Sequence, residues 1–270
     1  MAHDDVEPLV DVCADALWGA IEEGDRPIRR DRITHLLASD PAGAWVAEHA
    51  GAPVGCSMAL VREGLWGLSL LALAEEHRTG GTGRGLLRAA LTHARDARAA
   101  IILSSEHPAA MRIYARAGFA LHPTVSLNGL VTNPPEPAHG VREAGEGDIA
   151  WMDEVARAVR GAGYGADLAW WLEHSLTITG VRDRGFLVGR GPRVVALLAR
   201  DDEAATDLLR THLAQVAPGE SVELLFVAAG QDWAVQAGLE AGLALTPDGP
   251  LFTRGMPAPD GPWIPSGAFL

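Results

Sequence analysis

The 270-residue chain contains no lysine, and all 22 of its basic residues are arginine. The absence of lysine excludes Schiff-base catalysis, and it excludes a phosphate-binding P-loop that depends on a lysine. Acidic residues number 35, so the formal net charge is −13. This charge disfavours nonspecific binding to nucleic acid or to an anionic membrane, and we expect neither as a partner.

Cysteine is also scarce, with only Cys13 and Cys56 in the chain. Two cysteines are too few for a disulfide framework, and no signal peptide or membrane-spanning apolar run is apparent, so we expect a cytoplasmic protein. The ten histidines do not follow the spacing of metal ligands. The sequence therefore predicts no metal site.

Apolar residues make up 48% of the chain, enough for two well-buried domains of ordinary size. Helical spacing of apolar residues predicts a helix over 6–21 and a short one near 33–37. Further along, the pattern predicts strands at 45–47, 54–61, 65–73 and 100–103 and a helix over 86–94. Pro108 and Gly118 are typical of the start and end of another helix.

The Pro-rich stretch 133–139 is predicted to be a linker between domains over 1–132 and 140–270. Part of the first pattern returns after it. Asp148-Ile149 matches Asp5-Val6 at a helix start, and 237–245 resembles 113–121. The second copy is shorter where the first has its third strand and a Gly-rich turn. We interpret the chain as a tandem repeat whose second copy has lost that turn.

The Gly-rich turn has the pattern Arg-x-x-Gly-x-Gly at 78–83, between a predicted strand and a predicted helix. Backbone N–H groups at the start of a helix lack internal partners, and with the helix dipole they form an anion site suited to a pyrophosphate. Glycines let the backbone approach the phosphates closely. A dinucleotide-binding Rossmann motif does not fit, because no βαβ unit opens the chain.

Two segments carry a resemblance to a known family. Residues 71–87, which contain this turn, and residues 107–119 look like two motifs of the GCN5-related N-acetyltransferases (GNAT). The resemblance covers about 1–130 well and the remainder weakly. It implies the α/β (α+β) GNAT fold, a mixed and mostly antiparallel central sheet flanked by helices, here in two tandem copies. It also implies acetyl-CoA as co-substrate.

The resemblance assigns roles by position. The backbone of Leu71, Ala72 and Leu73 would contact the pantetheine arm at a strand opened by a bulge, and Tyr114 would act as general acid near the thioester sulfur. The pyrophosphate would be held by Arg78, Thr79, Gly80, Gly81, Thr82, Gly83 and Arg84. The sequence departs from the family at Thr79, where glycine is usual, and at His107, where asparagine is usual.

The expected reaction is direct attack of a neutral amine on the thioester in a ternary complex, with Tyr114 protonating the leaving thiolate. Tyr114 could instead simply pack on the sheet. The sequence assigns no base among the polar residues near the expected cleft, which are Glu75, Glu76, His77, Glu106 and His107. The acceptor is expected to be a small-molecule or peptide amine. An acidic and aromatic rim at Trp18, Glu22, Glu23 and Asp25 would suit a cationic one, although a solvated helix end is the preferred explanation.

The last ten residues, 261–270, contain no charged side chain, so we expect this segment to dock rather than to remain solvated. Some multidomain members of the resembling family place their C-terminal carboxylate in the transfer cleft as a base. By that resemblance Leu270 is a candidate catalytic residue. The alternative is a segment that only seals the interface between the domains.

The second domain is expected not to bind CoA. Its strand over 194–199 runs into Asp201-Asp202-Glu203, whose charges would repel a pyrophosphate, and Gly238 stands where the first copy has Tyr114. A non-catalytic acyl-CoA-binding or sensor protein is the alternative function, and an interaction module would explain only the second domain. A homodimer is compatible with the sequence.

Overall fold

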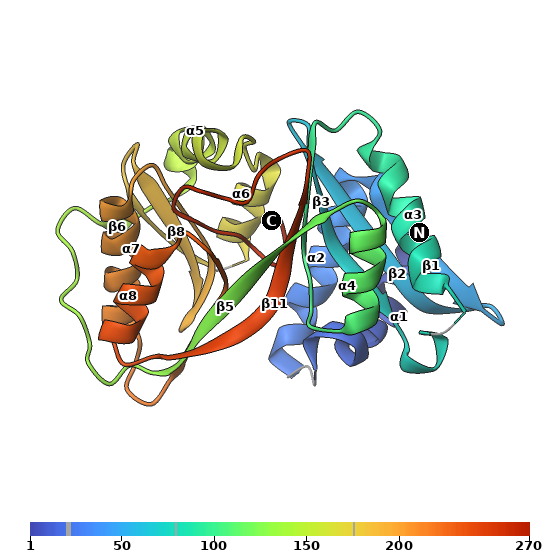
Figure 1. The fold of residues 1–270 in the computed structure, drawn as a ribbon, viewed down its shortest axis with the longest axis horizontal. Coiled ribbons are helices and arrows are strands. Elements are labelled where there is room, and N and C mark those ends of the chain that lie inside the picture. The colour runs from blue at the N-terminus through green and yellow to red at the C-terminus, as the bar shows by residue number, and fades with distance from the viewer. Residues whose placement is uncertain (20–22, 79, 175) are drawn as a thin grey trace. The chain divides into compact units, whose positions relative to one another are not determined.

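The computed structural model describes residues 1–270 except 20–22, 79 and 175. The chain forms two compact units. The first comprises Met1–Gly118 together with Ala268–Leu270, and the second comprises Phe119–Gly267. Each unit contains both strands and helices (Figure 1).

The first unit has four strands in the order β1-β2-β3-β4, all antiparallel except the parallel pair β3–β4. Helices α1, α2 and α3 contact β2. The strands are β1 Ala44–His49, β2 Ala52–Arg62, β3 Leu65–Leu73 and β4 Ala99–Leu103, and the helices are α1 Val6–Cys13, α2 Arg26–Ser39, α3 Thr82–Leu91 and α4 Pro108–Arg116.

The second unit orders its strands β11-β5-β10-β9-β8-β7-β6, with β12 paired to β9. The strands are β5 Ala120–Leu130, β6 Arg142–Glu143, β7 Thr177–Val181, β8 Gly185–Arg190, β9 Arg193–Ala199, β10 Ser221–Ala228, β11 Ala244–Arg254 and β12 Trp263–Ile264. The helices are α5 Ile149–Arg160, α6 Ala166–Glu173, α7 Asp202–Gln215 and α8 Asp232–Glu240.

The two units repeat one topology. In the first, α3 connects the parallel strands β3 and β4, and α4 follows; in the second, α7 connects the parallel strands β9 and β10, and α8 follows. A strand, a crossover helix and a parallel strand form the same βαβ step in both copies. The tandem arrangement of a mixed, largely antiparallel sheet flanked by helices therefore agrees with the predicted fold class.

The boundary between the compact units differs from the predicted linker at 133–139. It falls at Gly118, because β5 does not stay with the strands that precede it in sequence. This strand pairs antiparallel with both β10 and β11, from Ser221↔Leu130 and Ala244↔Asn128 onward. The last strand of the first copy is thus built into the sheet of the second.

Most predicted elements of the first unit lie where the sequence placed them. Helix α4 begins at Pro108 and is followed by Gly118 at φ +85°, a left-handed conformation that glycine adopts without strain. The helix predicted over 6–21 is shorter: α1 ends at Cys13 and continues as a single wider turn over Ala14–Trp18. The end of that prediction, at Ile21, lies outside the described residues.

Cys13 and Cys56 are both fully buried, with 3.7 Å between their Sγ atoms. The hydrogen bond between the thiols and their burial raise the pKa of Cys13 well above its usual range. A thiol that resists ionisation packs as a small apolar group. Among the residues that the structure describes, no helix is both long enough and apolar enough to cross a bilayer.

Candidate active site

Strand β3 changes its pairing halfway along its length. Its register with β2 passes from Met58↔Leu70 to Ala59↔Leu68, so Ser69 is an extra residue and forms a bulge. The pairs with β4 run from Leu65↔Ala99 to Leu68↔Ile102. Past the bulge the described β3 is therefore paired on one side only, as the resemblance predicts for the strand that receives the pantetheine arm.

The pairing also shows which backbone groups face the open side of β3. The amide of Ala74 donates to Val54 O of β2 at 2.9 Å. Because successive residues of a strand point their N–H and C=O groups to opposite sides, Leu73 and Leu71 direct theirs away from β2. The carbonyl of Leu73 accepts a hydrogen bond from Nε of Arg78 at 3.1 Å. Leu71 and Leu73 thus present backbone N–H groups on the side where the described pairs with β4 have ended, whereas Ala72 directs its N–H toward β2 and does not fit the predicted contact.

The Gly-rich turn leads directly into α3. Gly80 and Gly81 have φ of +85° and +91°, and Gly81 is the residue that caps the helix. The first helical hydrogen bond runs from Gly85 N to Gly81 O at 3.0 Å, so the N–H groups of residues 82–84 precede the helical ladder. The first turn of α3 contains no acidic residue. These groups can accept an anion at the positive end of the helix dipole.

Neither steric contacts nor backbone conformation within the described protein explains why α3 has glycine at Gly83 and Gly85. A Cβ added at Gly83 or Gly85 would meet no atom within 4 Å, and neither residue has a positive φ. Helix interiors favour alanine over glycine by about 1 kcal/mol. An open surface without side chains, next to unpaired N–H groups, fits a pyrophosphate that lies directly on the backbone.

The remaining cofactor residues border this surface. Arg78 and Arg84 are exposed, and Arg84 Nη2 lies 3.4 Å from the position that a Cβ would take on Gly81. Thr82 is half-buried at the first position of α3. Ala72 is buried in β3. Thr79 lies outside the described residues.

Tyr114 lies on α4 and is 4% exposed. Burial raises the pKa of its hydroxyl well above the usual value near 10. The phenol therefore stays protonated throughout the neutral range. A protonated hydroxyl is the form that a general acid requires.

The last three residues, Ala268–Leu270, pack in the first unit, in line with the expectation that the uncharged segment docks. Phe269 and Leu270 are buried. The ring of Phe269 meets the ring of His35 edge-on at 5.4 Å, and the Leu270 side chain fills the space beside Gly67 that a Cβ would occupy. Ala268 O accepts a hydrogen bond from Ser69 Oγ at 2.6 Å. The segment thus reaches the bulge of β3.

The polar residues considered as bases do not converge. Glu75, Glu76 and Glu106 are exposed, and exposed carboxylates are ordinary surface groups. His107 caps α4, where its Nδ1 accepts from Ala109 N at 3.3 Å. The ring of His77 lies 4.9 Å from that of His49.

Most side chains of the predicted acceptor rim lie outside the described part of the structure. Glu22 lies outside the described residues, and of Trp18 and Glu23 only the backbone is described. Asp25 is half-buried and precedes α2. The rim stays a prediction.

The corresponding helix of the second unit is closed to an anion. Asp201 caps α7 and accepts from Ala204 N at 2.9 Å, while Asp202 and Glu203 occupy the first turn. Arg184 binds Asp201 at 2.6 Å and Glu203 at 2.7 Å, and this single cation does not offset all three carboxylates. Gly238 has no room for a side chain, since a Cβ would lie 2.8 Å from Leu127 Cδ1.

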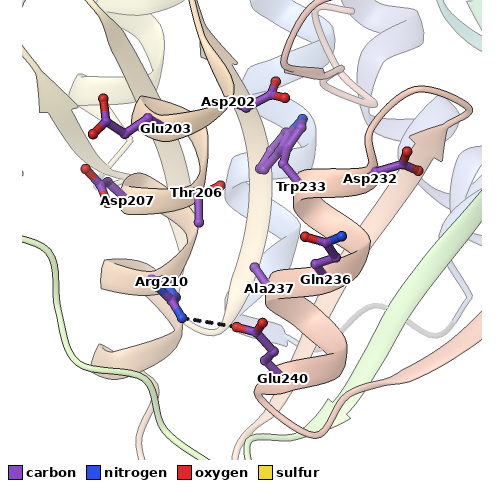
Figure 2. Close-up of a pocket in the computed structure, with 10 residues that line it drawn as sticks. All are labelled: Asp202, Glu203, Thr206, Asp207, Arg210, Asp232, Trp233, Gln236, Ala237 and Glu240. Carbon is purple, nitrogen blue, oxygen red and sulfur yellow. Dashed lines mark hydrogen bonds and ion pairs between the residues drawn. The ribbon is translucent and has the colours of Figure 1, made fainter.

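A groove of about 570 Å³ lies between α7 and α8 of this unit. Figure 2 shows the ion pair between Arg210 and Glu240, at 3.1 Å, beside Thr206 and Ala237. Five carboxylates line the groove: Asp202, Glu203, Asp207, Asp232 and Glu240. This lining is unsuited to a pyrophosphate.

Three residues of the site escaped the sequence reasoning, namely Arg32, Gly67 and Ser69. Gly67 is a glycine inside a mostly apolar strand, a pattern that indicates close approach of another segment. Neither Arg32 nor Ser69 carries a comparable signal. Within the described residues, no three histidine, cysteine, aspartate or glutamate side chains gather in a way that could hold a metal ion.

Comparison with known proteins finds one matching family model. The acetyltransferase (GNAT) family matches residues 10–119, which include β3, the Gly-rich turn and Tyr114. No curated protein matches the chain.

Solved structures share the fold of the whole chain. A candidate acetyltransferase from Pyrococcus horikoshii aligns with a TM-score of 0.81 at 15% identity, covering 100% of this chain and 94% of that one. A GCN5-related N-acetyltransferase from Kribbella flavida aligns at 0.63 with 18% identity, covering 94% and 69%. One from Sphaerobacter thermophilus aligns at 0.60 with 14% identity, covering 97% and 96%. Residues 10–119 therefore match the acetyltransferase (GNAT) family, and the solved structures share the fold of the whole chain.

Proposed function

We propose that this chain transfers an acetyl group from acetyl-CoA to an amine by direct attack in a ternary complex. The observation that carries the proposal is the start of α3, where the N–H groups of residues 82–84 precede the helical hydrogen bonds and Gly83 and Gly85 leave the backbone open. The pyrophosphate of CoA would lie on this surface. Arg78 and Arg84 would add positive charge beside it.

The pantetheine arm would run along the open side of β3, where Leu71 and Leu73 direct their N–H groups. In the reaction, the amine nitrogen bonds to the thioester carbon and the carbonyl oxygen gains negative charge. A backbone N–H near Leu71 would stabilise that oxyanion. The carbon–sulfur bond then breaks, and the Tyr114 hydroxyl gives its proton to the departing thiolate.

The amine must lose its own proton, and we assign this step to the carboxylate of Leu270. Support comes from the docking of Ala268–Leu270 in the same compact unit as the Gly-rich turn. A segment that only stabilises the fold is the competing role. Residues appended after Leu270 should abolish turnover with little change in thermal stability if the carboxylate is the base. Full activity of the extended chain would contradict that role, and a parallel loss of stability would favour the structural one.

Release of free thiol from acetyl-CoA, measured with a panel of small-molecule and peptide amines, tests the proposed reaction. We expect at least one amine to accelerate release above hydrolysis. Calorimetry on the same sample measures binding of acetyl-CoA alone. Binding without turnover on any amine would favour the non-catalytic acyl-CoA sensor, and absence of both would contradict the proposal.

A further inference from the structure

Ser69 occupies the bulge at which β3 separates from its neighbours. Its side chain is buried, at 8% exposure, and it has partners on two other elements. Nη2 of Arg32, on α2, lies 2.9 Å from both the carbonyl oxygen and the Oγ of Ser69. The Oγ of Ser69 lies 2.6 Å from Ala268 O in the C-terminal segment.

The direction of these hydrogen bonds follows from the chemistry of the groups. A guanidinium has only donors, and a hydroxyl has one proton and two lone pairs. Ser69 Oγ therefore accepts from Arg32 and donates its single proton to Ala268 O. The guanidinium of Arg32 is a charged donor. It polarises the Ser69 hydroxyl and so strengthens the hydrogen bond from Ser69 Oγ to Ala268 O.

The network joins two parts of the proposed active site. One end fixes the bulge, which sets the course of the strand that carries Leu71 and Leu73. The other end fixes Ala268, two residues before Leu270. We propose that Ser69 is a positioning residue for acetyl transfer, oriented by Arg32, and that it couples the docked C-terminal segment to the geometry of the open strand. This inference rests on the proposed function.

Packing alone would make Ser69 replaceable by alanine, because the smaller side chain leaves the bulge sterically free. The coupling role predicts a different outcome. Without the hydroxyl, Arg32 loses one acceptor and Ala268 O loses its donor, so the segment is held less tightly. Small displacements of reacting groups reduce turnover more than they reduce binding of a cofactor held elsewhere.

The test compares Ser69→Ala with Ser69→Thr, which keeps the hydroxyl. Ser57→Ala is the matched control, because Ser57 is a buried serine of the adjacent strand whose Oγ donates to Leu86 O at 3.1 Å. For Ser69→Ala we expect kcat to fall about tenfold or more while KM for acetyl-CoA stays within about twofold. Ser69→Thr should recover most of kcat, and Ser57→Ala should leave it within about twofold of the parent chain.

Hydrogen–deuterium exchange of the peptide that contains 268–270 provides a readout independent of turnover. We expect faster exchange in Ser69→Ala and protection in Ser69→Thr. Parental kcat and exchange in Ser69→Ala would overturn the inference and leave the proposed function standing. If the parent chain neither binds acetyl-CoA nor acetylates any amine, the proposed function fails. In that case, unchanged exchange of the 268–270 peptide in Ser69→Ala would show that Ser69 does not hold the segment either.

Discussion

The side chain of Leu270 occupies the position that a Cβ on Gly67 would take, so a residue of the C-terminal segment and a glycine of β3 fit each other sterically. Gly67 lies in the part of β3 that pairs with β4, opposite Ile101, and two residues before the bulge at Ser69. The segment therefore reaches the strand just before it opens. Its position in the fold, rather than any single polar group, makes it a candidate for a role in the reaction.

Gly67→Ala should displace the C-terminal segment. The added methyl overlaps the Leu270 side chain, and one of the two must move. We expect faster hydrogen exchange over 268–270 and a loss of turnover. The double variant Gly67→Ala, Leu270→Ala removes the overlap and should regain much of the exchange protection. Slow exchange in the single variant would mean that the strand accommodates the methyl without releasing the segment.

Gly83→Ala separates cofactor binding from stability. The methyl meets no protein atom, and alanine favours a helix by about 1 kcal/mol over glycine, so stability should stay constant or rise. Affinity for acetyl-CoA should fall about tenfold, because the methyl projects where the phosphates would approach the backbone. Calorimetry and thermal unfolding measure the two effects. Gly147→Ala, at a similarly open position of the second unit, should leave affinity unchanged.

Tyr114→Phe should lower kcat about 100-fold or more and leave KM for acetyl-CoA within about twofold, because a general acid acts on the leaving group in the chemical step. Since burial raises the pKa of Tyr114, its ionisation should not limit activity in the neutral range. Tyr164→Phe, at the only other tyrosine, removes a buried hydroxyl from the second unit and should not affect chemistry. Unchanged kcat in Tyr114→Phe, with chemistry rate-limiting, would mean that Tyr114 only packs.

Asp40 should give the first unit a pH-dependent stability. Burial alone would raise the pKa of Asp40, but bonds from Arg62 at 2.7 Å, His93 at 3.1 Å and Val61 N at 2.9 Å outweigh it and lower the pKa below its ordinary value of 3.8. The stabilisation is therefore complete above about pH 4 and disappears as the pH falls through the lowered pKa.

Asp40→Asn should accordingly cost about 3 kcal/mol in the free energy of unfolding at pH 7, and much less once Asp40 is protonated. Urea unfolding at pH 7 and at a series of pH values below 3.8 measures this difference. Asp11→Asn is the control, because Asp11 pairs with Arg26 at the surface, where such pairs contribute under about 1 kcal/mol. A difference between parent and Asp40→Asn that does not change with pH would contradict the assignment.

Local patterns predicted much of the first unit. The glycines before α3, and Pro108 with Gly118 around α4, determine local backbone geometry, so the sequence places these elements closely. Pairings between strands that lie far apart in the sequence could not be predicted in this way. No local signal indicates that β5 would join β10 and β11, since strand partners depend on the whole sheet. The same holds for Ser69, whose importance comes from Arg32 and Ala268, residues far from it along the chain.

In the second unit, a local pattern was sufficient to predict the start of a helix. Asp201, Asp202 and Glu203 predicted a helix start, and α7 begins there with Asp201 as its cap. That prediction succeeded because capping is a local property.

Calorimetric titration of the full chain with acetyl-CoA tests the central claim most directly. The start of α3 is open, flanked by Arg78 and Arg84, whereas the start of α7 is capped by Asp201 and carries two further carboxylates. We predict one binding site per chain, lost or weakened about tenfold in Gly83→Ala and unaffected by Gly147→Ala. Two sites per chain, or one site that is insensitive to Gly83→Ala, would contradict the account.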